Sequence, residues 1–185
     1  IIAWTPFNET RGISNPPQHH RLHADAYDLT KALDPTRPVN DASGYVHVKT
    51  DLWTIHNYDQ NPDSLASTLT PDPEKGVWRN FPDVECDYEG QPYIIDEFGG
   101  IKWIPQDRQA FAADSWGYGK GPTSEEEFYS RLSELVNAIL DREHICGYCY
   151  TQLTDVEQEQ NGIYNYDRSA KLDMERIAEI FRRER

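Results

Sequence analysis

Apolar residues recur at helical spacing in three parts of the chain. The first part covers residues 18–33 and ends before Pro35, because a proline disfavours the helical conformation of the residue before it. The second begins at Thr123 as N-cap, with Glu126 in the third position of a capping box, and the third covers residues 171–182. The expected buried stripes are Leu22, Ala26, Leu29 and Leu33; Phe128, Leu132, Leu135, Val136 and Ile139; and Ile177, Ile180 and Phe181. We therefore predict three helices that each bury one face.

Shorter apolar runs alternate with these helices and predict strands. The runs cover residues 1–5, 37–41, 51–58, 92–96 and 145–151. Strands that alternate with helices form a parallel sheet with the helices packed outside. We therefore expect an α/β fold, a partial (β/α)8 TIM barrel of about five parallel strands with outer helices. The connection of about ten residues between the second and third runs is shorter than a parallel crossover usually needs.

A short helix is expected near residues 63–69, inside a proline-rich connection that covers residues 59–91. A second long loop, residues 98–122, is rich in glycine and aromatic residues. Loops of that length in a compact domain are usually functional or disordered.

The composition limits the domain count and the partners. At 185 residues with 37% apolar content, residues 1–185 are expected to form a single domain. The formal charge of -14 would repel phosphate backbones and anionic lipid, so we expect neither a nucleic acid nor a membrane as partner. Because the numbering opens inside a strand-like run without Met, we expect a larger parent protein. The sequence does not identify the cellular compartment, and a secreted or periplasmic parent protein is compatible with it.

Two residue pairs have the spacing of metal ligands. Cys146 and Cys149 lie in an expected strand, where residues three apart point to opposite faces, and the sequence has no second cysteine pair. His19 and His23 are four residues apart on an expected helix, without the His-Glu-x-x-His context of a zinc site. We predict no metal site and no cofactor.

Two glutamates stand at the exits of apolar runs. Glu9 follows Asn8, and Glu97 follows Asp96 at the end of the fourth run. The 88 residues from position 9 to position 97 are close to three barrel units of roughly 31 residues, which places both glutamates on one rim. Because alternate strand residues share a face, we expect Glu97 to face the site and Asp96 to point away. Two such carboxyl groups are the minimum for cleaving a glycosidic bond.

Three segments extend this argument by resemblance. Trp4-Thr5-Pro6-Phe7-Asn8-Glu9 resembles the tail of the acid/base motif of glycoside hydrolase family 2, the β-galactosidase, β-glucuronidase and β-mannosidase family. Asp96-Glu97-Phe98-Gly99-Gly100 resembles its nucleophile segment, and residues 148–171 are similar to the stretch that closes its barrel. The likeness implies that the chain is the C-terminal portion of the catalytic barrel, from the fourth to the eighth strand.

The resemblance implies roles for five residues. Glu9 would be the general acid/base and Glu97 the nucleophile of a retaining mechanism, with carboxyl groups about 5–5.5 Å apart. Asn8 would hold the sugar 2-hydroxyl. Tyr58 matches the tyrosine that donates a hydrogen bond to the nucleophile. Tyr150 stands where many family members have a tryptophan, so the resemblance does not decide which residue the sugar stacks on.

Two further residues are candidates for substrate contact on their own chemistry. His56 stands near the end of a strand-like run, where it could touch substrate or be a packed residue satisfied by a backbone group. Trp103, like Trp116, lies in the long loop and could stack on a sugar face or serve only loop packing.

These features together predict an enzyme, a retaining β-glycosidase that removes terminal sugars from a carbohydrate substrate and is nearest the β-galactosidases. A glucuronidase is less favoured, because the Asn-x-Lys signature that grips a sugar carboxylate is absent near residues 158–163. The alternatives are an endo-acting retaining glycosidase of the same barrel clan and a non-catalytic carbohydrate-binding module. We expect the isolated chain to be inactive and to form a homo-oligomer through its unpaired barrel edges.

Overall fold

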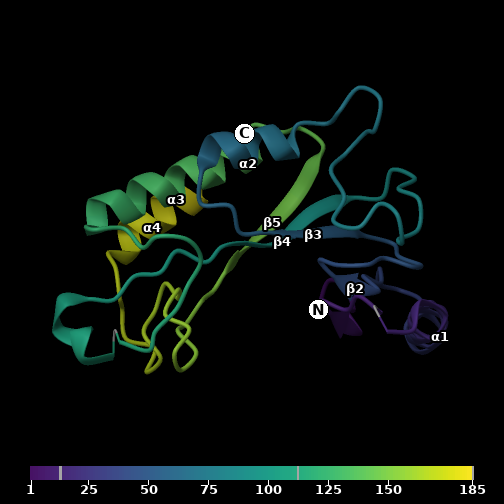
Figure 1. Cartoon of the computed structure of the whole chain (residues 1–185), viewed down its shortest axis with the longest axis horizontal. Coiled ribbons are helices and arrows are strands. Elements are labelled where there is room, and N and C mark those ends of the chain that lie inside the picture. The colour runs from purple at the N-terminus through teal and green to yellow at the C-terminus, as the bar shows by residue number, and fades with distance from the viewer. Residues whose placement is uncertain (13, 112, 185) are drawn as a thin grey trace. The chain divides into compact units, whose positions relative to one another are not determined.

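The fold is a mixed α/β arrangement, given by a computed structural model that describes residues 1–12, 14–111 and 113–184 (Figure 1). Along the chain the elements are β1 (Phe7–Asn8), α1 (Pro16–Leu33), β2 (Ala42–Ser43), β3 (Trp53–Asn57), α2 (Pro62–Leu69), β4 (Tyr93–Gly99), the 3-10 helix η1 (Gln106–Phe111), α3 (Glu125–Leu140), β5 (Ile145–Thr151) and α4 (Met174–Phe181). The alternation of strands and helices predicted from the sequence is confirmed. No helix in the described ranges is long and apolar enough to cross a bilayer.

The strands form two separate parallel sheets. One has two strands, β1 and β2, with Phe7 opposite Ala42 and Asn8 opposite Ser43. The other has the order β3-β4-β5. The expectation of about five parallel strands in one partial barrel is therefore met only in part, because no sheet of the described residues joins all five.

Pro6 explains why the first sheet is so short. The expected strand 1–5 is reduced to one parallel bridge, in which Trp4 lies opposite Val39. Strand β1 starts again after Pro6, in the same register relative to β2. A proline has no N–H to donate to a neighbouring strand, so it interrupts the ladder without shifting it.

By its internal contacts the chain divides into two compact units. The first unit comprises residues 1–56, 78–97 and 144–148, and the second comprises residues 57–77, 98–143 and 149–185. Each of the strands β3, β4 and β5 begins in the first unit and ends in the second. The single domain expected for residues 1–185 stays a prediction.

Helix α3 forms the core of the second unit together with α2 and α4, which it contacts on either side (Figure 1). Its predicted buried stripe is confirmed. The capping box lies one residue later than predicted: Ser124 is the N-cap and accepts from the Glu127 N–H, while the Glu127 carboxylate accepts from the Thr123 backbone N–H. Thr and Ser both occur at N-caps and Ser is the more favoured of the two, so the observed N-cap agrees with the stronger preference.

Helix α1 is turned differently from its predicted orientation. Leu22, Leu29 and Leu33 are 54%, 61% and 79% exposed, whereas His23 is buried. The His23 ring stacks on Phe7, and its Nε2 lies 2.8 Å from the Thr10 hydroxyl, which His19 also contacts. Polar contacts with the segment after β1 therefore decide which face of α1 turns inward, and the prediction from apolar spacing is wrong here.

A buried ion pair holds the segment after β5 in the second unit. Lys171 Nζ lies 2.6 Å from Asp155 Oδ1, and the two side chains are 0% and 2% exposed. Asp155 also accepts from the Gly162 N–H at 2.8 Å. Burial lowers the pKa of Lys171, and the Asp155 carboxylate opposes that shift.

Lys171→Met should therefore lower the free energy of unfolding by about 3–5 kcal/mol, because it leaves the Asp155 charge buried without its partner. Lys120→Met, at an exposed position, is the control and should change it by less than about 0.5 kcal/mol. Urea denaturation measures both variants, and Asp155→Asn combined with Lys171→Met should recover part of the loss. Equal losses for the two lysine variants would contradict this role of the pair.

Candidate active site

Glu9 is held by the first sheet in an unusual backbone conformation. It follows β1 directly, and its N–H donates to the Ser43 carbonyl oxygen at 3.1 Å, which extends the β1–β2 ladder by one residue. Its φ of 52° lies in the left-handed region, which residues other than glycine seldom adopt. Such strain is found mainly where the surrounding structure enforces it, often at functional sites.

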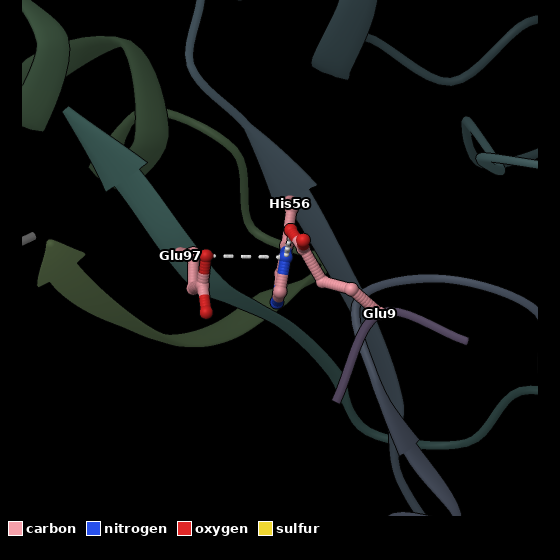
Figure 2. A group of neighbouring side chains, drawn as sticks. All are labelled: Glu9, His56 and Glu97. Carbon is pink, nitrogen blue, oxygen red and sulfur yellow. Dashed lines mark hydrogen bonds and ion pairs between the residues drawn. The ribbon is translucent and has the colours of Figure 1, made fainter. Parts of the chain in front are cut away.

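Three side chains from separate segments of the first unit meet at this point (Figure 2). His56 comes from β3 and Glu97 from the neighbouring strand β4, while Glu9 approaches from the end of β1. His56 Nδ1 lies 2.6 Å from Glu9 Oε1 and 3.2 Å from Glu97 Oε2. One ligand atom of each residue lies within 4.8 Å of the other two. The two glutamates predicted to share a site therefore do converge, with an imidazole between them.

The other edge of the His56 ring faces a second group of polar side chains. Its Nε2 lies 2.9 Å from Ser43 Oγ and 3.4 Å from Asp96 Oδ1. The Ser43 hydroxyl donates to Asp96 Oδ2 at 2.6 Å, and Asn40 donates to the same oxygen at 3.3 Å. Asp96 was expected to point away from the site. That expectation is wrong, because Asp96 and Glu97 both contact the His56 ring, at Nε2 and Nδ1 respectively.

Burial and charge act in opposite directions on His56. Its side chain is 2% exposed, against 35% for Glu9, 18% for Asp96 and 24% for Glu97. Burial by itself would lower the pKa of His56, but the hydrogen bonds to Asp96 and Glu9 and the negative charges of Asp96 and Glu97 raise it above its ordinary value. The imidazole is therefore biased toward its protonated, cationic form.

Gly44 leaves the space that this ring occupies. A Cβ at position 44 would lie 1.9 Å from His56 Cδ2, and the φ of 76° there also favours glycine. Gly44 directly follows Ser43, so the same turn supplies the hydroxyl and the room for the ring.

A buried carboxylate ties β2, the strand that contains Ser43, to the segment that follows it. Asp41 is 1% exposed and accepts from the backbone N–H groups of Ala42, Val48 and Lys49. Its Oδ1 also lies 2.7 Å from His47 Nδ1. Burial by itself would raise the pKa of Asp41, but His23, His47 and the Val48 N–H, which all face the carboxylate, lower that pKa well below the usual range, so Asp41 stays ionised.

The spacing of Glu9, His56 and Glu97 also raises the question of a metal ion. Zinc bonds to nitrogen and oxygen ligands are about 2.0–2.2 Å long, and tetrahedral geometry then separates two ligand atoms by more than 3 Å. The 2.6 Å between His56 Nδ1 and Glu9 Oε1 is instead a hydrogen-bond distance. We therefore interpret the cluster as a hydrogen-bonded one.

The remaining predicted site residues have different surroundings. Asn8 is exposed in β1, next to Glu9. Tyr58, Trp103 and Tyr150 belong to the second unit. The Tyr58 ring stacks on Tyr118 with centroids 3.6 Å apart. Trp103 is 9% exposed, whereas Trp116, also in the long loop, is 47% exposed and thus more available for stacking.

Tyr150 is buried against Gly99 of the Asp-Glu-Phe-Gly-Gly segment. Its hydroxyl accepts from the Ile101 N–H and donates to the Asn161 carbonyl oxygen, both at 3.3 Å. A Cβ at position 99 would lie 2.3 Å from Tyr150 Cε2. The glycine after the glutamate and the tyrosine in the last strand therefore fit each other, and burial raises the pKa of the Tyr150 hydroxyl.

Sequence reasoning missed Asn40, Ser43 and Asp96 as members of the cluster. The signal for Asp96 was its place beside Glu97, which strand alternation led us to set aside. Asn40 and Ser43 lie in a run with neither strong periodicity nor a recognised motif, so nothing local marked them.

No protein-family model and no curated protein matches the chain. The chain does match solved structures. A β-glucuronidase of an uncultured Clostridium aligns with TM-score 0.65 and 18% identity, and that of Dictyoglomus thermophilum with 0.67 and 15%; each alignment covers 98% of this chain and 32% of the other. A GH2 β-galacturonidase from Eisenbergiella tayi, bound to galacturonate, gives 0.62 and 20%, over 98% of this chain and 33% of that one. The chain thus has the fold of about a third of these glycosidases.

His56 should titrate with a pKa above the ordinary 6.5, and Glu9→Gln should lower that pKa by removing a charged hydrogen-bond acceptor. The matched control is Glu74→Gln, at an exposed position. NMR titration measures the pKa of the His56 imidazole in the unaltered protein and in each variant, and loss of its signals in His56→Asn assigns them. Because the pKa of His56 is higher in the folded state than in the unfolded state, protonation of His56 also stabilises the fold. This contribution is complete below pH 6.5 and is lost as the pH rises through the folded-state pKa. An unchanged pKa in Glu9→Gln would contradict the coupling.

Proposed function

We propose that the protein is a retaining β-glycosidase of glycoside hydrolase family 2, and that this chain is the C-terminal part of its (β/α)8 barrel. The observation that carries the proposal is the approach of two carboxylates: one oxygen of Glu9 and one of Glu97 lie within 4.8 Å of each other. Carboxyl groups about 5–5.5 Å apart favour a retaining mechanism, whereas inverting enzymes need about 6.5–9.5 Å to admit a water molecule.

In the proposed mechanism the two carboxyl groups act in turn. Glu97 attacks the anomeric carbon and forms a covalent glycosyl ester, while the carboxylic acid of Glu9 gives its proton to the departing oxygen. Glu9 then takes a proton from a water molecule, whose oxygen attacks the anomeric carbon and releases Glu97. Both carboxylates are partly exposed, at 35% and 24%, so a substrate that enters from solvent can reach them.

The other predicted residues take supporting roles in this proposal. Asn8 would hold the sugar 2-hydroxyl, Tyr58 would donate a hydrogen bond to Glu97, and Tyr150 would form part of the sugar platform. Of the two loop tryptophans, the more exposed Trp116 is better suited than Trp103 to stack on a sugar.

For the substrate we propose a terminal neutral β-glycoside of the galactoside type. The net charge of -14 and the missing Asn-x-Lys signature support a neutral sugar. A β-uronide is the second candidate, because the matched structures are named as β-glucuronidases and a β-galacturonidase. Relative kcat/KM values on aryl β-galactoside, β-glucuronide and β-galacturonide decide between them.

Two other functions remain as alternatives from the sequence. An endo-acting glycosidase would cleave internal polysaccharide bonds faster than aryl glycosides. A carbohydrate-binding module would bind a sugar in calorimetry and show no turnover.

Glu97→Gln should abolish hydrolysis of aryl β-glycosides by the full-length protein, because the amide cannot act as the nucleophile. Glu9→Ala should lower kcat/KM by about 10²–10⁴ for a poor leaving group. With an activated leaving group, azide should restore turnover, because it attacks the glycosyl ester of Glu97 without a general base, forms a glycosyl azide and releases the Glu97 carboxylate. The matched control is Glu74→Gln. Proton NMR of the first product formed should show retained configuration. An inverted product, or activity left intact in Glu97→Gln, would reject the mechanism.

The isolated 185-residue chain should show little turnover, because it spans about a third of the length of the glycosidases it matches. Strands β3 and β5 end the order β3-β4-β5, and unpaired strand edges favour association. We therefore propose that the isolated chain forms a homo-oligomer, which light scattering measures. A monodisperse monomer would count against this, and robust turnover by the isolated chain would refute its inactivity.

A further inference from the structure

The proposed mechanism uses Glu9 and Glu97 but leaves His56 without a part. The His56 side chain is 2% exposed, so its ring is almost completely shielded from solvent. The side chain is nevertheless in direct contact with both glutamates and biased toward its cationic form. A buried cation between two catalytic carboxylates must affect which of them carries a proton.

The hydrogen bonds around the ring fix where its protons lie. The Ser43 hydroxyl uses its own hydrogen to donate to Asp96 at 2.6 Å, so its oxygen accepts from the Nε2–H of His56 at 2.9 Å. Nε2 therefore keeps its hydrogen in both the charged and the neutral ring. The proton that can leave is the one on Nδ1, which lies between His56 and Glu9.

We propose that His56 is a positioning residue that stores, between turnovers, the proton that Glu9 delivers as general acid. This rests on the proposed glycosidase function. When substrate arrives, the Nδ1–H bond breaks and an O–H bond forms at Glu9 Oε1, 2.6 Å away. The ring becomes the neutral Nε2–H form and Glu9 becomes a carboxylic acid. After Glu9 has taken a proton from water in the second step, that proton returns to Nδ1, so no proton is gained or lost over the cycle.

The groups facing His56 from each neighbouring element are consistent with this role. Glu97 from β4 approaches the same nitrogen as Glu9, at 3.2 Å, and Asp96 approaches Nε2 at 3.4 Å. The Tyr45 ring lies with its centroid 5.9 Å from that of His56. Three carboxylates thus favour the cationic ring, but only Glu9 combines a short contact to Nδ1 with the greatest exposure, at 35%. Glu9 is the acceptor best placed to pass a proton outward.

The consequence is a shift in the alkaline limb of the pH–rate profile. In the unaltered protein this limb reports loss of the last proton from the coupled pair of His56 and Glu9, not from Glu9 alone. His56→Asn removes the stored proton and leaves Glu9 to titrate by itself. The limb should therefore move to lower pH, and kcat/KM at pH 7.5 should fall by at least about 10-fold for an aryl glycoside with a poor leaving group.

The test measures kcat/KM against pH for the full-length protein, His56→Asn and Asp96→Asn, with Glu74→Gln as control. Asp96→Asn keeps the ring but removes a charge that favours its cationic form, so the limb should move in the same direction by a smaller amount. It also keeps the proposal testable if His56→Asn fails to fold. A dinitrophenyl glycoside needs no acid assistance, so its rate at pH 7.5 should fall less than 3-fold in either variant.

An alkaline limb that stays in place in both variants would overturn the proposal, as would equal losses for good and poor leaving groups, which indicate a purely structural role. Failure of the glycosidase function itself looks different. In that case the unaltered protein hydrolyses no aryl glycoside at any pH, or Glu97→Gln leaves its rate unchanged.

Discussion

The contact of one buried imidazole with carboxylates on both of its edges is the constraint on which the rest of the site depends. Two carboxylates within 4.8 Å of each other repel by at least about 3.5 kcal/mol at an effective dielectric constant of 20. The cationic form of the His56 ring offsets this repulsion, because its Nδ1 lies 2.6 Å from Glu9 and 3.2 Å from Glu97. Without a cation at this position, the two glutamates would favour separation or protonation.

The backbone around this contact is arranged to bring three distant segments to one ring. The ladder between β1 and β2 keeps its register past Pro6 and ends with the Glu9 N–H on Ser43. The left-handed φ of Glu9 then turns its side chain out of the ladder. Gly44 leaves the space for His56, and buried Asp41 fixes the loop between them. A change in any of these positions would therefore act on the site through His56.

Strong periodicity allowed most of the larger elements to be predicted. Strand β5 has the predicted bounds, and α3 has the predicted buried stripe, because apolar residues at helical spacing decide its packing. Helix α1 was misjudged because polar contacts of His19 and His23 with Thr10 decide its orientation, and apolar spacing carries no information about them. The split into two sheets depends on which strands pair, which is a property of contacts between distant segments and not of any one run.

The residues of the site divide in the same way, into those that the sequence could predict and those that it could not. The two glutamates could be found because each ends an apolar run and carries a motif. The second layer could not, since it is joined to the site only by contacts that the fold creates: Ser43 and Asp96 contact the His56 ring, and Asn40 donates to Asp96. Strand alternation led us to set Asp96 aside, but it gave no warning that a side chain on the neighbouring strand would contact both Asp96 and Glu97. Alternation describes the direction in which a side chain leaves its own strand, not which side chains of neighbouring strands reach it.

The charge of the cluster also bears on the proposed chemistry. Glu9, Asp96 and Glu97 together outnumber the single cation on His56, so the region around the anomeric carbon would be negative. A glycosidic bond breaks through a transition state with oxocarbenium character, and a negative field that is already in place stabilises that positive charge more than the neutral sugar. The same field opposes a sugar that carries its own carboxylate. In the proposed mechanism this charge would favour neutral glycosides, and a uronide would need a compensating cation close to its carboxylate.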